Sequence, residues 1–289
     1  MKITKIKNGI KNEKIKVKSK TNTIKTCPNL IKLHSLTAFI GNRGSGKTNT
    51  AVLLAKKLKD CRAIDRIFII SPTYYSNPTF NILNIDEEDI YTDIDEVFEA
   101  LDDIKEKVEQ EKKDHDDYHH YMKIVEKLLI KGENYLTYQE INELENNDYK
   151  LPTHKYYGRQ PGLLLIVDDM SHSKIYSHGR NPFINLCLRH RHLSQGLGIS
   201  IFMLLQNFKT GLPKCLRQNM TQIIIYKSHD LSQVKEMYIE LLANQMSLDN
   251  FMKMYEYATK EDHDFLFLDF NPQDKALKFR KNFDESLNL

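Results

Sequence analysis

The sequence predicts an α/β fold with a mostly parallel central sheet flanked by helices. Three observations lead to this prediction. Short apolar runs of strand length recur along the chain, at 36–40, 67–70, 163–167 and 199–205. Apolar residues at helical spacing lie between these runs, as in 50–59, and a glycine-rich turn at 41–48 joins the first run to that segment. Strands that alternate with helices form β-α-β units, which build parallel sheets.

The first 32 residues differ in composition from the rest of the chain. They hold ten lysines and one acidic residue, Glu13, whereas the remaining residues hold 32 basic and 38 acidic side chains, for a net charge of +3 overall. Lysines alternate with apolar residues around Asn8-Gly9, a pattern typical of a hairpin or an edge strand. We interpret 1–32 as a lysine-rich N-terminal arm or hairpin, which serves either solubility or contact with a phosphate backbone, and 33–289 as one domain.

The domain begins with a β-α-β unit. A strand over Leu36 to Ile40 leads through the turn Gly41 to Thr48 into a helix over Thr50 to Lys59. The positions of this helix with core-facing spacing are Val52, Leu53, Ala55 and Leu58. A second strand, Ile67 to Ile70, ends at Ser71-Pro72.

Residues 80–160 interrupt this alternation. Between Asp86 and Asp117 there are sixteen acidic residues and four lysines, with apolar residues at helical spacing, and a stretch rich in tyrosine follows. We interpret 80–160 as a helical, acidic insertion that forms either a lid or a docking surface. The histidines at 115, 119 and 120 have no clear set of further ligands, so we do not expect a metal site there.

Strands and helices alternate again after residue 160. We expect strands at Leu163 to Val167, Ile199 to Leu205, Gln222 to Tyr226 and Asp264 to Asp269, and helices over 182–194 and 231–257.

Other features exclude several classes of protein. The longest apolar runs fall far short of the roughly 18 residues that span a bilayer, and the N-terminus lacks the apolar stretch of a secretory signal. The four cysteines show no CxxC spacing, which argues against a zinc ribbon or a disulfide framework, and we interpret them as buried thiols. We therefore expect an intracellular protein that does not contact a membrane.

The turn Gly41-Asn42-Arg43-Gly44-Ser45-Gly46-Lys47-Thr48 matches the phosphate-binding pattern G-x-x-x-x-G-K-[ST] at every position. Glycines at this spacing let backbone N–H groups surround a β-phosphate, and the next helix points its positive N-terminal end at the same anion. Lys47 then neutralises the β- and γ-phosphate oxygens, and the Thr48 hydroxyl coordinates Mg²⁺. The sequence therefore predicts a P-loop that binds ATP with Mg²⁺. We count Thr50 with these residues as a candidate for nucleotide binding.

Two carboxylates follow the apolar strand Leu163 to Val167. Asp168 and Asp169 therefore lie at the carboxyl edge of the predicted sheet, where ligands bind in such folds. We expect Asp168 to hold the metal and Asp169 to polarise the attacking water as a general base.

A third polar side chain, Gln206, follows the strand Ile199 to Leu205. An amide beside Asp168 can bond both the γ-phosphate and the attacking water, and so report whether triphosphate is bound. A strand that intervenes between the P-loop strand and the metal-acid strand, here Ile67 to Ile70, indicates a RecA-like P-loop NTPase with a catalytic acid, a class that usually works as rings.

Four segments together resemble a known family: GNRGSGKT, LLLIVDDM, RHRHLSQGLGISIFMLLQN and GLPKCLRQNMTQIIIYK. They are similar to the genome-packaging ATPases of nucleo-cytoplasmic large DNA viruses and their virophage relatives, within the FtsK-HerA superfamily. The resemblance covers about residues 33–270 apart from 80–160. It implies an ATPase that forms a pentameric or hexameric ring around duplex DNA, without sequence specificity, and drives the genome into a capsid. Capsid or vertex proteins are the implied partners, and the implied location is the host cytoplasm, a viral factory or the virion.

The resemblance also implies roles for two arginines. Arg191 with His192 matches the family's Arg-His pair, and Arg217 with Asn219 matches the later Leu-Arg-x-Asn segment. Either arginine is then a candidate for the finger that reaches the γ-phosphate of a neighbouring copy, which typically raises the rate by about 10³ to 10⁵. The doubled Arg-His repeat at 189–192 leaves the register open by two residues. Cellular members of the superfamily more often have Glu at the position of Asp169.

Two further interpretations remain open. The first is an assembly, secretion or plasmid-mobilising ATPase of the same superfamily. The second is a nucleotide-gated scaffold that binds ATP without hydrolysing it.

Overall fold

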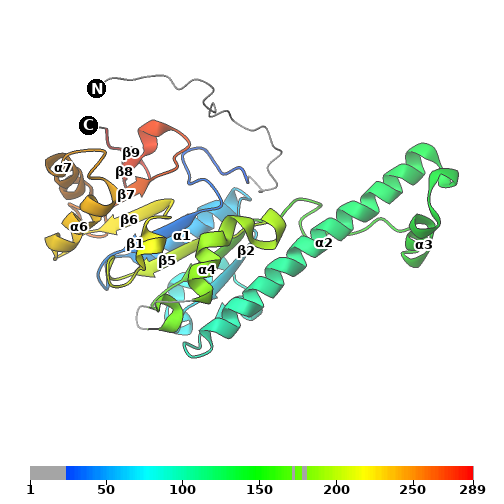
Figure 1. Ribbon diagram of the computed structural model, residues 1–289, viewed down its shortest axis with the longest axis horizontal. Helices are drawn as coiled ribbons and strands as arrows, with labels where there is room; N and C mark the ends of the chain where they lie inside the picture. The colour runs from blue at the N-terminus through cyan, green and yellow to red at the C-terminus, as the bar shows by residue number, and fades with distance from the viewer. Residues whose placement is uncertain (1–23, 171–172, 178–180, 289) are drawn as a thin grey trace, which may run out of the picture.

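The computed structural model describes residues 24–170, 173–177 and 181–288. Among these residues, nine strands form one sheet in the order β3-β2-β4-β5-β1-β6-β7-β8-β9 (Figure 1). The strands are β1 (Leu36–Ile40), β2 (Arg66–Ile70), β3 (Ile90–Tyr91), β4 (Leu163–Val167), β5 (Ser200–Leu205), β6 (Gln222–Tyr226), β7 (Phe265–Asp269), β8 (Phe279–Lys281) and β9 (Glu285–Ser286). The α-helices are α1 (Lys47–Asp60), α2 (Val97–Lys131), α3 (Tyr138–Asn146), α4 (Pro182–Arg189), α5 (Lys214–Arg217), α6 (Leu231–Leu241) and α7 (Leu248–Ala258).

The prediction of a mostly parallel α/β sheet is confirmed. Strands β3, β2, β4, β5, β1 and β6 are parallel, and β7 to β9 extend the sheet in the antiparallel sense. The strand between β1 and β4 in the sheet is β5, whereas β2 lies on the far side of β4. The prediction that Ile67–Ile70 lies between the P-loop strand and the strand before Asp168 was therefore wrong. Strand β5 lies between them, because the order of strands in the sheet differs from their order in the chain.

Both faces of the sheet are buried. Helix α1 packs on one face, and α2, α4, α6 and α7 pack on the other. Successive residues of β1 alternate between the two layers: Ala38 faces the second group of helices and Phe39 faces α1. The predicted core position Leu53 was wrong, since its side chain is 49% exposed and Leu54 is buried in its place.

Helix α2 has 35 residues and is therefore about 52 Å long. Its first half, including Leu101 and Val108, packs on the sheet, whereas its second half extends away from the body and packs on α3 (Figure 1). We call residues 118–150 the projection. Its own small core is built on Tyr121, Ile124, Val125 and Leu144. That residues 80–160 are an insertion into an ATPase domain stays a prediction.

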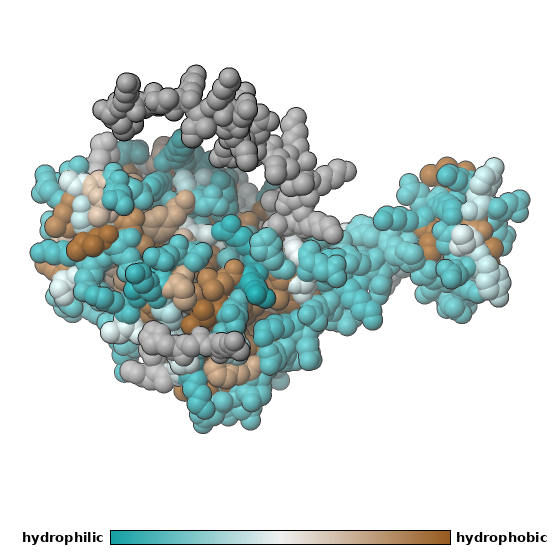
Figure 2. All heavy atoms as spheres, in the orientation of Figure 1, coloured by the Kyte–Doolittle hydropathy of each residue, from teal (hydrophilic) through white to brown (hydrophobic). Residues whose placement is uncertain are grey.

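The far end of the projection exposes apolar side chains, which Figure 2 shows as a brown group separated from the body. Leu129, Ile130 and Tyr138 are 78%, 71% and 78% exposed. The rest of the projection's surface that Figure 2 shows is mainly hydrophilic.

Arg66, the first residue of β2, anchors α2 to the sheet. Its guanidinium donates to Asp89 Oδ2 at 2.7 Å, to Glu111 Oε1 of α2 at 3.0 Å and to Glu88 Oε1 at 2.8 Å. Asp89 and Glu111 are buried, with side chains 1% and 7% exposed. The hydrogen bond to Asp89 is the main reason that the pKa of Arg66 is raised, so the guanidinium stays charged in this partly buried site.

The sequence also led to predictions about an N-terminal hairpin, the cysteines and membrane-spanning helices. The hairpin around Asn8-Gly9 lies outside the described residues. The prediction of four buried thiols was wrong: Cys187 is buried, Cys27 and Cys61 are partly exposed and Cys215 is exposed. Within the described ranges, no helix is both long enough and apolar enough to cross a bilayer.

The anchor at Arg66 gives a first testable prediction. Arg66→Met leaves two buried carboxylates without their main cation, so we expect the free energy of unfolding to fall by about 3 kcal/mol in chemical denaturation. The matched control is Lys105→Met, which removes the exposed pair with Asp102 and costs less than about 1 kcal/mol. Equal losses in the two variants would contradict the anchoring role of Arg66.

Candidate active site

The glycine-rich turn connects β1 to α1 and has the backbone of a phosphate-binding loop. Gly44 and Gly46 have φ values of +80° and +96°, a backbone conformation that residues with a Cβ rarely adopt. Helix α1 begins at Lys47, three residues earlier than the predicted start at Thr50. Lys47 and Thr48 therefore lie in the first turn of α1, at the positive end of the helix.

Thr48 links the loop to the strand that carries the carboxylates. Its hydroxyl donates to Asp168 Oδ2 at 2.9 Å, although the two residues are 120 positions apart. The Lys47 ammonium donates to the carbonyl oxygens of Gly41 at 2.7 Å and Asn42 at 2.8 Å. Burial lowers the pKa of Lys47, and the nearby carboxylates of Asp168 and Asp169 act in the opposite direction.

Asp168 and Asp169 follow β4 at the carboxyl edge of the sheet. Asp168 is only 6% exposed, and its backbone N–H donates to Ile70 O at 3.0 Å. The pKa of Asp168 is raised, mainly because the carboxylate is buried. The hydrogen bond from Thr48 lowers this pKa, and the nearby charge of Asp169 raises it. Asp169 is exposed and has a φ of +55°, in the left-handed region that residues with a Cβ rarely adopt. Such backbone strain concentrates at functional sites.

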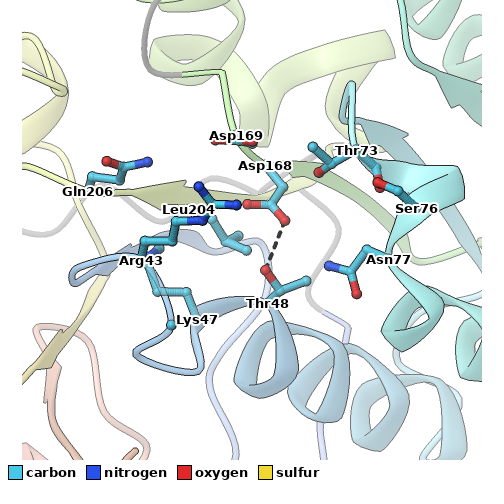
Figure 3. Close-up of a pocket in the computed structure, with 11 residues that line it drawn as sticks. Arg43, Lys47, Thr48, Thr73, Ser76, Asn77, Asp168, Asp169, Leu204 and Gln206 are labelled. Atoms are coloured by element: carbon cyan, nitrogen blue, oxygen red, sulfur yellow. Dashed lines mark hydrogen bonds between the residues drawn. The ribbon is translucent and has the colours of Figure 1, made fainter.

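These side chains share one cavity of about 390 Å³ with Gln206, the residue after β5 (Figure 3). Asp168 lies between Gln206 on one side and the loop after β2 on the other (Figure 3). The lining residues are Arg43, Gly44, Lys47, Thr48, Thr73, Ser76, Asn77, Asp168, Asp169, Leu204 and Gln206. The structure therefore brings together the predicted Lys47, Thr48, Asp168, Asp169 and Gln206. Thr73, Ser76 and Asn77 were not among the residues predicted from the sequence.

Some predicted nucleotide-binding residues lie elsewhere. Thr50 does not line the cavity; it is buried within α1, and its N–H donates to Gly46 O at 2.9 Å. Asn42 and Ser45 line an adjacent cavity of about 350 Å³, together with Arg43 and Gly44. None of the residues around the main cavity comes from 80–160, so the structure does not support a lid formed by that segment.

Arg191 lies at the opposite edge of the sheet from the cavity. It belongs to the segment His190–Gly196, which leads into the start of β5, and its side chain is exposed. The six residues of β5 separate the two edges by roughly 20 Å. Arg191 therefore does not reach the cavity of its own chain and is free to contact another molecule.

Arg217 lies in a different environment, which corrects its assignment as a candidate finger. Its side chain is buried, and Nε donates to both carboxylate oxygens of Glu240 at 3.0 Å. Nη1 donates to Leu212 O at 2.6 Å, and the guanidinium stacks on the ring of Phe208. These contacts hold the loop after β5 and leave the guanidinium engaged within its own chain.

The oxygen ligands in the cavity fit a magnesium ion. Thr48 Oγ1 and the carboxylate of Asp168 are hard ligands of the kind that Mg²⁺ prefers, and few protein ligands suffice because the ion keeps several waters. Across the described residues, no group of three or more His, Cys, Asp or Glu side chains is arranged to hold a metal on its own. His119 and His120 instead contact Gly158 O at 2.7 Å and Glu143 Oε2 at 3.2 Å.

The fold and the cavity are those of a P-loop nucleotide-binding protein. No protein-family model and no curated protein sequence matches the chain.

Solved structures do show similarity to this chain. One is the genome packaging NTPase B204 from Sulfolobus turreted icosahedral virus 2 in complex with ATP-gammaS, at 14% identity over 88% of this chain and 98% of that one, with a TM-score of 0.49. A second is EssC (ATPases 2 and 3) from Geobacillus thermodenitrificans, with 12% sequence identity over 83% of this chain and 38% of that one and a TM-score of 0.44. A third is the pCW3 conjugation coupling protein TcpA, with 14% sequence identity over 82% of this chain and 59% of that one and a TM-score of 0.40.

Two buried histidines, His34 and His190, lie close to Arg191. Burial lowers the pKa of His34 to about 4, and the nearby His190 adds to this. Burial likewise lowers the pKa of His190 to about 4. His190 Nδ1 lies 2.6 Å from Cys187 O, and the ring of His34 fills the space that a Cβ at Gly198 would need. Both imidazoles are therefore held neutral in the folded protein.

These histidines give a second prediction. Their pKa values are near 6.5 in the unfolded chain and about 4 in the folded one, so between these limits the unfolded state binds more protons. We expect the free energy of unfolding to fall as pH drops from 6.5 to 4, by up to about 1 kcal/mol per pH unit for each histidine. His34→Gln should flatten this slope in denaturation measured across the range, and the exposed His192→Gln should not. Identical slopes in the two variants would contradict the assignment.

Proposed function

We propose that this chain is a Mg²⁺-dependent ATPase. The observation that carries the proposal is the 2.9 Å hydrogen bond between Thr48 and Asp168, in a cavity that also holds Lys47, Asp169 and Gln206. A cation, a hydroxyl and two carboxylates at the mouth of a phosphate-binding loop are the groups that hydrolysis of a nucleoside triphosphate requires.

Each side chain has a role in this chemistry. The loop N–H groups and Lys47 bind the β- and γ-phosphate oxygens, and Thr48 with Asp168 holds the Mg²⁺, which neutralises developing phosphate charge when bound. Asp169, exposed at the cavity, accepts the proton of the attacking water as that oxygen forms a bond to the γ-phosphorus, while the bond from the γ-phosphorus to the β–γ bridging oxygen breaks and ADP leaves. Gln206 orients the same water.

We propose that the chain forms a ring and that a second copy completes the ATPase site. In the proposed ring, Arg191 of one copy reaches the γ-phosphate of its neighbour, since it is exposed and roughly 20 Å from the cavity of its own chain. A head-to-tail ring places one edge of each subunit against the opposite edge of the next, which suits a side chain that lies on the far edge.

We further propose that ATP hydrolysis drives double-stranded DNA into a viral capsid. The resemblance of the four sequence segments to packaging ATPases supports this cargo. The exposed Lys209 and Lys214, and the lysines of the N-terminal sequence 1–32, are candidates for contact with DNA phosphates, which gives binding without sequence specificity. Capsid or vertex proteins are the proposed further partners. An assembly or mobilisation ATPase, or a scaffold without turnover, remains the alternative.

Hydrolysis itself gives the third prediction. Asp169→Asn removes the proposed base, so we expect the ATP turnover rate to fall by at least about 10²-fold while nucleotide binding is retained. Lys47→Ala should abolish hydrolysis and leave oligomerisation intact, as measured by phosphate release and sedimentation. If the wild-type protein shows negligible turnover and Asp169→Asn leaves it unchanged, the alternative of a scaffold that binds ATP without hydrolysing it is favoured.

DNA coupling gives the fourth prediction. Duplex DNA should stimulate ATP hydrolysis at low salt, and the stimulation should weaken steeply between 50 and 200 mM salt because phosphate contacts release counterions, an effect of roughly 10³ to 10⁵ in affinity for extensive contacts. Random-sequence duplexes should stimulate equally well. ATPase activity indifferent to DNA at low salt would reject translocation and leave the nucleotide site standing.

A further inference from the structure

The loop after β2 forms one wall of the cavity. Thr73, Ser76 and Asn77 line the cavity from this loop, on the side of Asp168 that faces away from Gln206 (Figure 3). The loop follows β2, and β2 pairs with β4, the strand that ends at Asp168. Nothing in the P-loop pattern or in the paired carboxylates assigns a role to this wall.

The loop is held in place by its own hydrogen bonds. Ser71 N donates to Tyr91 O at 2.9 Å, and Asn77 N donates to Tyr74 O at 3.1 Å. The ring of Tyr74 stacks on Phe80, with centroids 5.4 Å apart. The wall is therefore a built surface with a fixed backbone.

Two of the three polar side chains are already engaged within the loop. The Ser76 hydroxyl donates to Thr73 O at 2.9 Å, and the hydroxyls of Ser71 and Thr73 lie 3.2 Å apart. Their hydrogen-bonding capacity is thus partly used before any ligand arrives.

Asn77 differs from them. Its Oδ1 accepts from Thr79 N at 3.2 Å and caps the short helix Pro78–Leu83, which fixes the orientation of the amide, because only the oxygen can accept. The amide nitrogen has no acceptor among the described residues, and Figure 3 shows it turned towards Thr48. The cap therefore presents a neutral hydrogen-bond donor to the cavity.

We propose that Asn77 is a second amide donor to the terminal phosphate of ATP, opposite Gln206. This inference rests on the proposed ATPase function and adds a residue to it. The oxygen of a water bound to Mg²⁺ is a weak acceptor because the cation withdraws its electron density, whereas an anionic phosphate oxygen accepts hydrogen bonds strongly. As the bond to the β–γ bridging oxygen breaks, negative charge is spread over all three γ-phosphoryl oxygens. Lys47 and Gln206 lie on one side of the cavity and Asn77 lies on the other (Figure 3).

The effect of this donor depends on when its contact forms. A donor fixed by its own cap is already oriented before the reaction, so it stabilises the charge of the transition state without rearrangement. Its loss should lower kcat and leave KM nearly unchanged, because interactions specific to the transition state act on kcat.

The fifth prediction tests this with Asn77→Ser and Asn77→Asp. Serine keeps a side-chain oxygen that can cap Thr79 N but loses the amide N–H, and its shorter hydroxyl does not extend as far into the cavity, so kcat should fall about 10- to 100-fold while KM changes less than about threefold. Binding of ADP with aluminium fluoride, which mimics the transition state, should weaken by a similar factor, while binding of ADP alone stays the same. Aspartate keeps the capping oxygen but places a negative charge against the phosphate, so both kcat and ATP affinity should fall further.

The matched control is Asn81→Ser, an exposed asparagine in the short helix that Asn77 caps and outside the cavity, which should stay within about twofold of the wild-type kcat. Wild-type turnover in Asn77→Ser would overturn the inference, as would equal weakening of ADP and of ADP with aluminium fluoride, which indicates a purely structural role. If Asn77→Ser lowers the melting temperature by several degrees, the affinities for ADP and for ADP with aluminium fluoride are compared well below that temperature, and their ratio, which a loss of folded protein does not change, decides. Absence of ATP hydrolysis in the wild-type protein would instead reject the proposed ATPase function.

Discussion

The position of β5 between β1 and β4 is the constraint on which the site depends. These three strands are parallel and in continuous register, so the residues that follow each of them emerge at one edge of the sheet. The P-loop, Asp168 and Gln206 come from three distant parts of the chain and meet only because of this order. The apolar side chains of the three strands are buried on both faces of the sheet. The hydrogen bond from Thr48 to Asp168 is then a consequence of the sheet order.

The sequence was sufficient where a local pattern determines the structure. Strands β1, β4 and β6 have the predicted bounds, because continuous apolar runs flanked by polar or glycine residues have one favourable buried arrangement. The phosphate-binding loop and the two aspartates were found for a similar reason, since their chemistry fixes both residue type and spacing. The antiparallel direction of β7 to β9 has no local signature, because strand direction is decided by long-range pairing.

The sequence was insufficient where tertiary contacts determine a side chain's role. Arg217 and Arg191 both lie in segments that resemble a known family, yet one is engaged by Glu240 and the other is exposed at the far edge of the sheet. Asn77 reads as an ordinary turn residue before a proline, and only its cap and its place beside Asp168 distinguish it. A signal was available in one respect: ligands in such folds lie beyond the carboxyl ends of parallel strands, and Ser71 to Asn77 follow such a strand.

Strand β2 connects the two most distant features of the molecule. Arg66 at its first residue binds Glu111 of α2, and the loop at its other end lines the cavity beside Asp168. The projection is the end of a lever arm of several tens of ångströms, and the contact of Arg66 with Glu111 joins the base of that arm to β2. Strand β2 pairs with β4, the strand that Asp168 follows.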